Sequence, residues 1–561
     1  MSESILPTTT AGISPEKFPD DLFFARNRRV AVIILAAFML VGFALRVNHL
    51  GSESLSEDEL NKLQTVEEYR ANGLSGKNGE HPFLMKGLQT VSIIASEKLN
   101  TFISVPENKI SDEAALRFPV ALFGTFTALL IFLLVSELFG NSIGLVSAVL
   151  WTIEPMAIGF DRIAKEDSLL LFFFLLTTLF WIRGQSAAER GEKNWRLYAW
   201  ATAVGFAAMM ASKYYPHLIG IIGAYYIIFQ QIPGRKWDMG KINWLKFFIV
   251  LGIAFLIFNP TIFIPDTWRE MLKFSSENRI GHASYEFMGE IYRNQFTAWL
   301  AGLPWTFYYI FIGVKTSQIT LVLFLIGVPL AFRRKLGDGR FFLLFWALLV
   351  FFPFTIIGGK FTRYFTVDEP MVLIAAAIGF CFIAKRLSES LPRQTAVRLQ
   401  AVLFLVVIAF PLYNSINAAP NFRLVTNAIG TQFRPAGSYF PHDEFYDVST
   451  REIVAAIAPL ARPQAVVACE TPTLFEYYAH KIGRDDLVFV SLSDKSKVAG
   501  LVEGDLIVAA SGRRYFSNSA YLDALAGSTP TTETKIKDIS SARIYKLDAS
   551  NLPAIHNIAE H

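Results

Sequence analysis

Long apolar segments recur along most of this 561-residue chain, and they constrain its fold more than any other feature. A helix needs about 20 mainly apolar residues to cross a bilayer core. Eleven runs reach or approach that length, at 30–47, 118–139, 142–159, 167–183, 197–212, 214–231, 244–263, 318–332, 341–357, 370–384 and 399–415. A weaker run at 299–313 could lie along the interface. We therefore predict a polytopic α-helical membrane protein with about 11–13 transmembrane helices.

Basic residues in the short connections predict the orientation. Lys and Arg are enriched on the cytoplasmic side of membrane proteins. With the spans above, five clusters fall on one side: Arg26, Arg28 and Arg29; Arg183, Arg190, Lys193 and Arg196; Arg235, Lys236 and Lys241; Arg333, Arg334 and Lys335; and Lys385, Arg386, Arg393 and Arg398. The N-terminus, residues 1–29, is then cytoplasmic. It has no apolar core of a cleavable signal peptide.

The other, extracytoplasmic side receives two long loops, 48–117 and 264–317, and the tail 416–561. In the tail, β-like runs at 465–469, 487–492, 506–510 and 542–547 alternate with helix-like stretches. This alternation predicts a small soluble α/β domain after a membrane domain that spans 30–415. The tail contains no glycine-rich nucleotide motif.

Composition excludes some classes of function. The chain is 52% hydrophobic and 18% charged, and its net charge of +4 is not gathered into the basic face that a nucleic-acid partner requires. The two cysteines, Cys381 and Cys469, offer neither a disulfide framework nor metal-ligand spacing.

The acidic pair Asp58-Glu59 follows the first apolar span by about ten residues. Ionisable groups beside a membrane path indicate a functional site. A carboxylate there could act as the general base for an acceptor hydroxyl. The alternative is a solvated acidic turn, since other glutamates lie nearby.

A second polar segment runs from Glu80 through His81-Pro82 to Lys86. Pro82 stiffens the turn and favours an extended His81. His81 could orient an acceptor or a phosphate, and Lys86 could face an anionic headgroup. A structural helix start is the alternative interpretation.

Three further groups stand at predicted membrane boundaries. Arg162 and Asp167 belong to a charge run between two spans, where Arg162 could contact phosphate and Asp167 could hold it in place; a solvated loop is the alternative. Lys213 lies among aromatic residues, which suits either an interfacial anchor or a lipid phosphate. Lys360, Arg363 and Tyr364 follow a glycine pair and favour an anion site, because arginine offers bidentate donors to phosphate. His282 is an isolated candidate in the loop 264–317.

Taken together, these residues resemble the GT-C class of membrane glycosyltransferases, in particular the protein O-mannosyltransferase family and bacterial relatives such as the lipid A aminoarabinose transferases. The Asp-Glu pair matches Asp58-Glu59, and a His-Pro-Pro-Leu-Gly-Lys pattern is approximated by residues 81–86, with departures at Phe83 and Met85. Other motif residues of the family, which lie beside later membrane spans, are matched here by Arg117, Arg162, Asp167, Lys213, Arg363 and Tyr364. The resemblance covers about residues 30–385.

This resemblance implies that Asp58 is the base and that Arg162, Lys213 and Arg363 bind the phosphate of a polyprenyl-phosphate sugar. It implies no cofactor and gives only weak support for a divalent metal. The eukaryotic members carry a β-trefoil domain in a lumenal loop, for which this chain has no room. Its α/β tail leaves the acceptor open among a protein, a lipid and a glycan.

We therefore expect an inverting glycosyltransferase in a bacterial inner or plasma membrane. It would transfer a monosaccharide, mannose by family default, on the extracytoplasmic face. The alternative is a secondary transporter or lipid flippase, although transporters often show internal repeats and none is visible here. An inactive scaffold is a third possibility. The sequence leaves open the sugar, the lipid chain length, the oligomeric state and the role of the tail.

Overall fold

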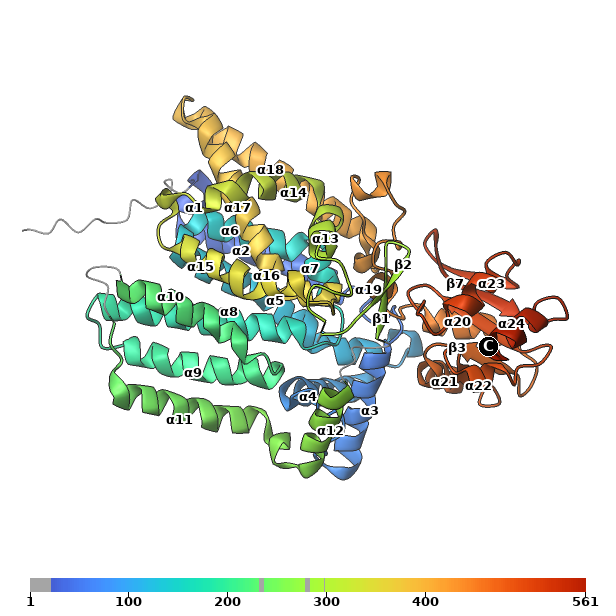
Figure 1. Ribbon diagram of the computed structural model, residues 1–561. Coiled ribbons are helices and arrows are strands. Elements are labelled where there is room, and N and C mark those ends of the chain that lie inside the picture. Colours follow the sequence, from blue (N-terminus) through green and yellow to red (C-terminus); the bar gives the residue numbers. More distant parts are fainter. Residues whose placement is uncertain (1–21, 232–236, 278–282, 297, 561) are drawn as a thin grey trace, which may run out of the picture.

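A helical bundle carries a separate α/β region at one end (Figure 1). The computed structural model describes residues 22–231, 237–277, 283–296 and 298–560. These residues contain mostly helices, and the sheet that gives the α/β region its character lies after residue 465. The predicted fold class is therefore confirmed.

Seven helical segments among the described residues are long and apolar enough to cross a membrane. They are α2 (Arg28–Val47), α5 (Asp112–Phe139), α8 (Asp167–Glu189), α11 (Gly240–Phe258), the continuous run 339–356, α17 (Glu369–Ser388) and α18 (Arg393–Ala418). The run 339–356 joins α15 (Gly339–Trp346), a π-helical turn (Ala347–Phe351) and α16 (Phe352–Ile356). The protein is thus a multi-pass membrane protein.

The remaining predicted spans are helical but shorter or less apolar, which explains why seven segments qualify where 11–13 were expected. These helices are α6 (Asn141–Ile153), α9 (Trp195–Ser212), α10 (Ile219–Gln231) and α14 (Gln318–Ala331). The run 142–159 breaks after Ile153, and α7 (Pro155–Phe160) restarts with a proline at its first position, where the missing N–H is tolerated. The weak run 299–313 yields only the nine-residue α13 (Phe307–Lys315).

The non-membrane elements gather at one end of the bundle (Figure 1). They are α3 (Glu57–Asn72), α4 (Phe83–Asn100), α12 (Pro265–Glu277), the hairpin of β1 (Ser284–Phe287) and β2 (Glu290–Arg293), and the tail from α19 (Pro441–Phe445) onward. Basic residues such as those that open α2 and α18 lie at the other helix ends. Which end faces the cytoplasm remains a prediction.

The tail folds around a five-stranded sheet of order β4-β3-β5-β7-β6. Its strands are β3 (Val466–Cys469), β4 (Val488–Ser491), β5 (Leu506–Ala510), β6 (Thr532–Ile536) and β7 (Ile539–Lys546). The first three strands in sheet order pair in parallel, and β5, β7 and β6 pair antiparallel. The sequence did not predict β6, whose Thr and Lys residues suit a polar edge strand. The helices that accompany the sheet are α20 (Thr450–Ile457), α21 (Pro472–Lys481), α22 (Lys495–Val498), α23 (Ser519–Leu525) and α24 (Leu552–Glu560).

A capping box determines where α3 begins. The backbone N–H of Glu59 donates to the Ser56 hydroxyl, and the Glu59 carboxylate accepts from the Ser56 N–H, which satisfies two otherwise unpaired donors. The same carboxylate accepts two hydrogen bonds from the Arg117 guanidinium, at 2.8 and 2.7 Å. Both side chains are almost fully buried. The pair therefore joins the start of α3 to the membrane helix α5.

We expect Arg117→Met to lower the free energy of unfolding by about 3–5 kcal/mol, because it leaves the Glu59 carboxylate buried without its cation. The matched control is Arg70→Met, which breaks the exposed Arg70–Glu97 pair and should cost less than about 1 kcal/mol. Unfolding of the detergent-solubilised protein measures both changes. Equal losses in the two variants would contradict the structural role of Arg117.

Candidate active site

A cavity of about 550 Å³ opens where the non-membrane elements meet the bundle. Its walls come from the start of α3, the segment 165–167 before and at the start of α8, the segment after α9, helix α12, the loop 361–364 and the tail. Among the described residues, its lining includes six carboxylates: Glu57, Asp58, Glu80, Glu166, Asp167 and Asp447. It also includes four cations: Lys165, Lys213, Arg363 and Arg513.

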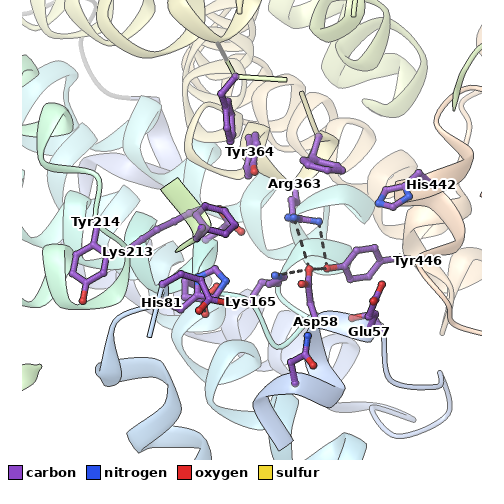
Figure 2. Close-up of a pocket in the computed structure, with 18 of the residues that line it drawn as sticks. Glu57, Asp58, His81, Lys165, Lys213, Tyr214, Arg363, Tyr364, His442 and Tyr446 are labelled. Carbon is purple, nitrogen blue, oxygen red and sulfur yellow. Dashed lines mark hydrogen bonds and ion pairs between the residues drawn. The ribbon is translucent and has the colours of Figure 1, made fainter. Parts of the chain in front are cut away.

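Asp58 projects into this cavity among hydrogen-bond donors and cations (Figure 2). Its Oδ2 atom lies 2.5 Å from Lys165 Nζ and 3.8 Å from Arg363 Nη2, and it accepts a 2.7 Å hydrogen bond from the Tyr446 hydroxyl. Burial alone would raise the pKa of Asp58, but the charges of Lys165, Arg363 and Lys62 hold it well below its usual value. Asp58 is therefore ionised at neutral pH.

A second cluster of polar side chains, formed by Lys62, Glu166 and His81, lies beside Asp58. Lys62 Nζ is 2.7 Å from Glu166 Oε1, and His81 Nδ1 is 3.7 Å from the same oxygen. Burial lowers the pKa of His81 well below 6.5, against the opposing effect of Glu166. His81 is therefore neutral at pH 7 and can offer one donor and one acceptor to a ligand.

Lys213 occupies another part of the cavity wall, away from Asp58 (Figure 2). Its Nζ atom lies 2.6 Å from Asp167 Oδ1 and sits over the rings of Tyr215 and Tyr364, at 4.8 and 4.7 Å from their centroids. Such cation–π contacts are attractive for a partly desolvated ammonium group. The arrangement presents one cation between a carboxylate and two aromatic faces.

Arg363 is held by aromatic rings at the start of a short 3₁₀ turn (Thr362–Val367). Its guanidinium lies 4.4 Å from the Phe361 ring centroid and 5.5 Å from that of Tyr446. Gly358, just before this loop, has a packing role: a Cβ there would lie 1.9 Å from the Ala301 carbonyl oxygen. The close approach of the two loops requires glycine and places Arg363 over the cavity.

The structure brings seven of the predicted site residues to the cavity: Asp58, Glu80, His81, Asp167, Lys213, Arg363 and Tyr364. Five others lie outside its lining: Glu59, Lys86, Arg117, Arg162 and Lys360. His282 lies outside the described residues.

The five residues outside the lining bind other parts of the protein. Glu59 and Arg117 bind each other. Lys86 donates to the carbonyls of Asn78 and His81 at 2.7 and 3.0 Å, and burial lowers its pKa to about 8. Arg162 donates to the carbonyl of Arg46, in the last turn of α2, and to those of Asn48 and His49, which follow this helix. Lys360 donates to the Leu303 and Ile357 carbonyls. These positions do not place Arg162, Lys86 or Lys360 against a ligand in the cavity.

Sequence reasoning missed the contribution of the tail. Tyr446, which bonds Asp58, and Asp447 follow α19 with φ angles of 46° and 61°, a left-handed conformation uncommon outside glycine. Asp447 is held by an ion pair with Arg513, which follows β5. Nothing in the local sequence signals these contacts, since Tyr446 lies 388 residues from Asp58 and Arg513 lies 66 residues from Asp447. Lys165 belongs to the charge run of residues 161–167, which is the sequence signal that could identify it.

No group of three or more His, Cys, Asp or Glu side chains in the described part of the chain is placed to hold a metal ion.

Comparison with known proteins gives a partial match to a family. Residues 108–263 match the family model of dolichyl-phosphate-mannose-protein mannosyltransferase. The predicted resemblance to membrane glycosyltransferases is confirmed. The matched segment contains Arg117, Arg162, Asp167 and Lys213, whereas Asp58 and Arg363 lie outside it.

Individual relatives are distant. YkcB of Bacillus subtilis (strain 168), a mannosyltransferase by assignment only, is 33% identical over 97 residues, which cover 17% of this chain and 13% of YkcB. ArnT from Cupriavidus metallidurans, solved with undecaprenyl phosphate, shares 14% identity over 91% of this chain and 97% of its own, with a TM-score of 0.46. An oligosaccharyltransferase of Archaeoglobus fulgidus shares 11% identity over 86% of this chain and 69% of its own, with a TM-score of 0.49.

The pKa of Glu59 makes stability depend on pH. Burial would raise this pKa, but Arg117 and the backbone donors lower it to about 2, below the unfolded value near 4.3. The stabilisation is present above pH 4–5 and is lost as the pH falls toward 2, about 3 kcal/mol in all. We expect Glu59→Gln to have a lower unfolding midpoint than wild type at pH 6, and this difference to shrink as the pH falls from about 4 toward 2. A constant difference across this range would contradict the assignment.

Proposed function

We propose that this protein is a membrane glycosyltransferase that moves a monosaccharide from a polyprenyl-phosphate donor to an acceptor hydroxyl, with inversion at the anomeric carbon. The observation that carries this proposal is Asp58, an ionised carboxylate in a cavity at the end of the membrane bundle, within reach of Lys165, Arg363 and Tyr446. The family model over residues 108–263 supports the same class of reaction. Mannose is the sugar that the family name suggests.

In this reaction Asp58 takes the proton of the acceptor hydroxyl as its oxygen bonds to the anomeric carbon. The bond from that carbon to the phosphate oxygen breaks, and the electron pair leaves with the lipid phosphate. Lys165 and Arg363 are placed to stabilise the charge on the leaving phosphate, the kind of electrostatic effect that usually contributes most to catalysis. No acid is needed on the leaving side, because a phosphate ester leaves as an anion.

Lys165 and Arg363 also lower the pKa of Asp58, the proposed base. A carboxylate whose pKa is strongly depressed is a weak base. A donor phosphate that approaches Lys165 and Arg363 would share their charge and so raise the pKa of Asp58. Donor binding would thereby strengthen the base at the moment when it is required.

Helix α12 supports a donor that arrives from the membrane. Met271 and Phe274 of this helix line the cavity, while Trp268 and Leu272 expose 50% and 68% of their surface. An amphipathic helix of this kind suits the membrane interface. A lipid tail could remain in the bilayer beside α12 while its phosphate reaches the cations. In this arrangement the reaction takes place on the extracytoplasmic face, and the acceptor is a protein, lipid or glycan.

We expect Asp58→Asn to lose at least about 10²-fold in transfer, the lower range for a positioned general base, and to keep binding the donor. The measurement uses purified protein in lipid nanodiscs, radiolabelled polyprenyl-phosphate sugars and host envelope extract as acceptor. Asp485→Asn, an equivalent change at an exposed site on the tail, is the matched control. Full turnover by Asp58→Asn would exclude Asp58 as the base.

Lys165→Met should move the acid limb of kcat/KM to higher pH. Lys165 lowers the pKa of Asp58, so its removal raises that pKa, and the carboxylate is protonated over a wider acidic range. The rate at the optimum should also fall, because one phosphate contact is lost. Lys481→Met, at an exposed position on α21, should leave the profile in place. An unshifted acid limb in Lys165→Met would argue against Asp58 as the titrating group.

A further inference from the structure

Glu57 is the exposed carboxylate beside the proposed base. It is the first residue of α3, its side chain is 51% exposed, and it lines the cavity next to Asp58 (Figure 2). Burial and the nearby Asp447 and Asp58 raise its pKa, while Arg513 opposes them. None of the proposed catalytic steps uses Glu57.

Arg513 forms a fixed cation behind Glu57. Its Nη1 atom lies 3.7 Å from Glu57 Oε2, and its guanidinium also binds both carboxylate oxygens of Asp447. The Asp447 carboxylate in turn accepts from the Glu57 backbone N–H at 3.3 Å. Because Arg513 is held by Glu57 and Asp447, its guanidinium has little freedom to move toward an approaching anion. The three side chains are therefore pre-organised.

The α/β domain places Arg513 at this point. Arg513 follows the carboxyl end of β5, which pairs in parallel with β3, and ligands of α/β sheets bind beyond the carboxyl ends of such strands. The Asn518 side chain donates to the Arg513 carbonyl at 2.8 Å and to Glu470 Oε1 at 2.7 Å. The α/β domain thus contributes Arg513 to the cavity of the membrane domain. This residue comes from the sheet edge at which such domains bind ligands.

The charges at this end disfavour an anionic acceptor. Glu57 and Asp447 face one cation, Arg513, and that cation is already paired. Among the residues that the structure describes, the lining includes six carboxylates and four cations, and an anion brought close to Glu57 and Asp447 in a partly desolvated site is costly. A carboxylate accepts hydrogen bonds only. A neutral hydroxyl can therefore donate to Glu57, whereas an anionic group is disfavoured there.

Aromatic rings complete this end of the cavity. His442 lies 5.4 Å from the Phe361 ring and 6.2 Å from the Tyr446 ring, measured between centroids, and all three line the cavity. Rings beside hydrogen-bonding carboxylates suit a ligand with an apolar C–H face and polar edges, which is the surface of a pyranose sugar.

We propose that Glu57, His442 and Arg513 form an acceptor subsite for an uncharged sugar residue, so that the acceptor is a neutral glycan and not a phosphorylated glycolipid or a peptide. The inference rests on the proposed function only in calling this sugar the acceptor. It gives the tail the role of acceptor recognition, since two of the three side chains come from the tail.

Binding tests the subsite without any turnover. Saturation-transfer-difference NMR is recorded on the full-length protein in nanodiscs with methyl glycosides of the common neutral hexoses and with the matching hexose 6-phosphates. We expect at least one neutral glycoside to give signals that fall at least fivefold in Glu57→Gln, and its 6-phosphate to give weaker signals. Glu67→Gln, the same change at an exposed position of α3, should match wild type.

Three results would overturn the proposal: no neutral glycoside binds, the 6-phosphates bind better, or Glu57→Gln binds as wild type does. Glu57 is half exposed, so its substitution by Gln should leave folding intact, and the unfolding midpoint checks this.

A kinetic experiment separates this proposal from the proposed function. With a labelled polyprenyl-phosphate sugar and the neutral glycoside that binds, Glu57→Gln should raise the acceptor KM about tenfold and shift the donor KM less than twofold. Transfer only to a phosphorylated glycolipid or to a peptide would reject the subsite and keep the transferase. Glycoside binding that depends on Glu57, without transfer from any donor, would keep the subsite and reject the transferase.

Discussion

The buried ion pair between Glu59 and Arg117 holds the first turn of α3 against membrane helix α5, and the cavity is arranged around that turn. The carboxylate accepts from the guanidinium, from the Ser56 N–H and from the Ala164 N–H at 2.8 Å. One side chain therefore connects α3, α5 and the segment that carries Lys165. Because Glu59 points inward, its neighbour Asp58 on the same turn points into the cavity, and Lys165 arrives opposite it. Of the two adjacent acidic residues, Glu59 therefore has a structural role, and Asp58 faces the cavity.

The tail holds the same turn from the other side. The Ser54 N–H donates to the Val448 carbonyl at 2.9 Å, and the Leu55 N–H donates to the Tyr478 hydroxyl at 2.7 Å. Together with the hydrogen bond from Tyr446 to Asp58, these contacts place segment 54–58 between the membrane domain and the α/β domain. A change in how the tail sits would move Asp58 relative to Lys165 and Arg363. The tail is part of the geometry of the site and not an appended module.

The sequence could predict those features that depend on local pattern. Apolar runs located the membrane helices, alternating patterns located most strands of the tail, and charged residues at span ends such as Asp58, Lys213 and Arg363 lie on the cavity. Pattern could not distinguish a cation that faces a ligand from one that binds backbone carbonyls. Arg162 and Lys360 look like anion ligands in sequence, yet each satisfies carbonyl groups left unpaired at helix ends and loops. Only the three-dimensional structure shows which backbone carbonyls accept these hydrogen bonds.

In the proposed reaction, the pairing of cations with carboxylates across the cavity would affect the order in which donor and acceptor engage the site. Lys165 and Arg363 lie against Asp58, and Lys213 lies against Asp167, so a phosphate that binds must compete with a carboxylate for each cation. Such an exchange costs less than desolvating an unpaired cation, because the charge is already partly removed from water. In the proposed reaction it would also link donor binding to the basicity of Asp58. An acceptor hydroxyl at the Glu57 end of the cavity would therefore meet an effective base only once the donor phosphate has engaged the cations, which limits unproductive proton transfer.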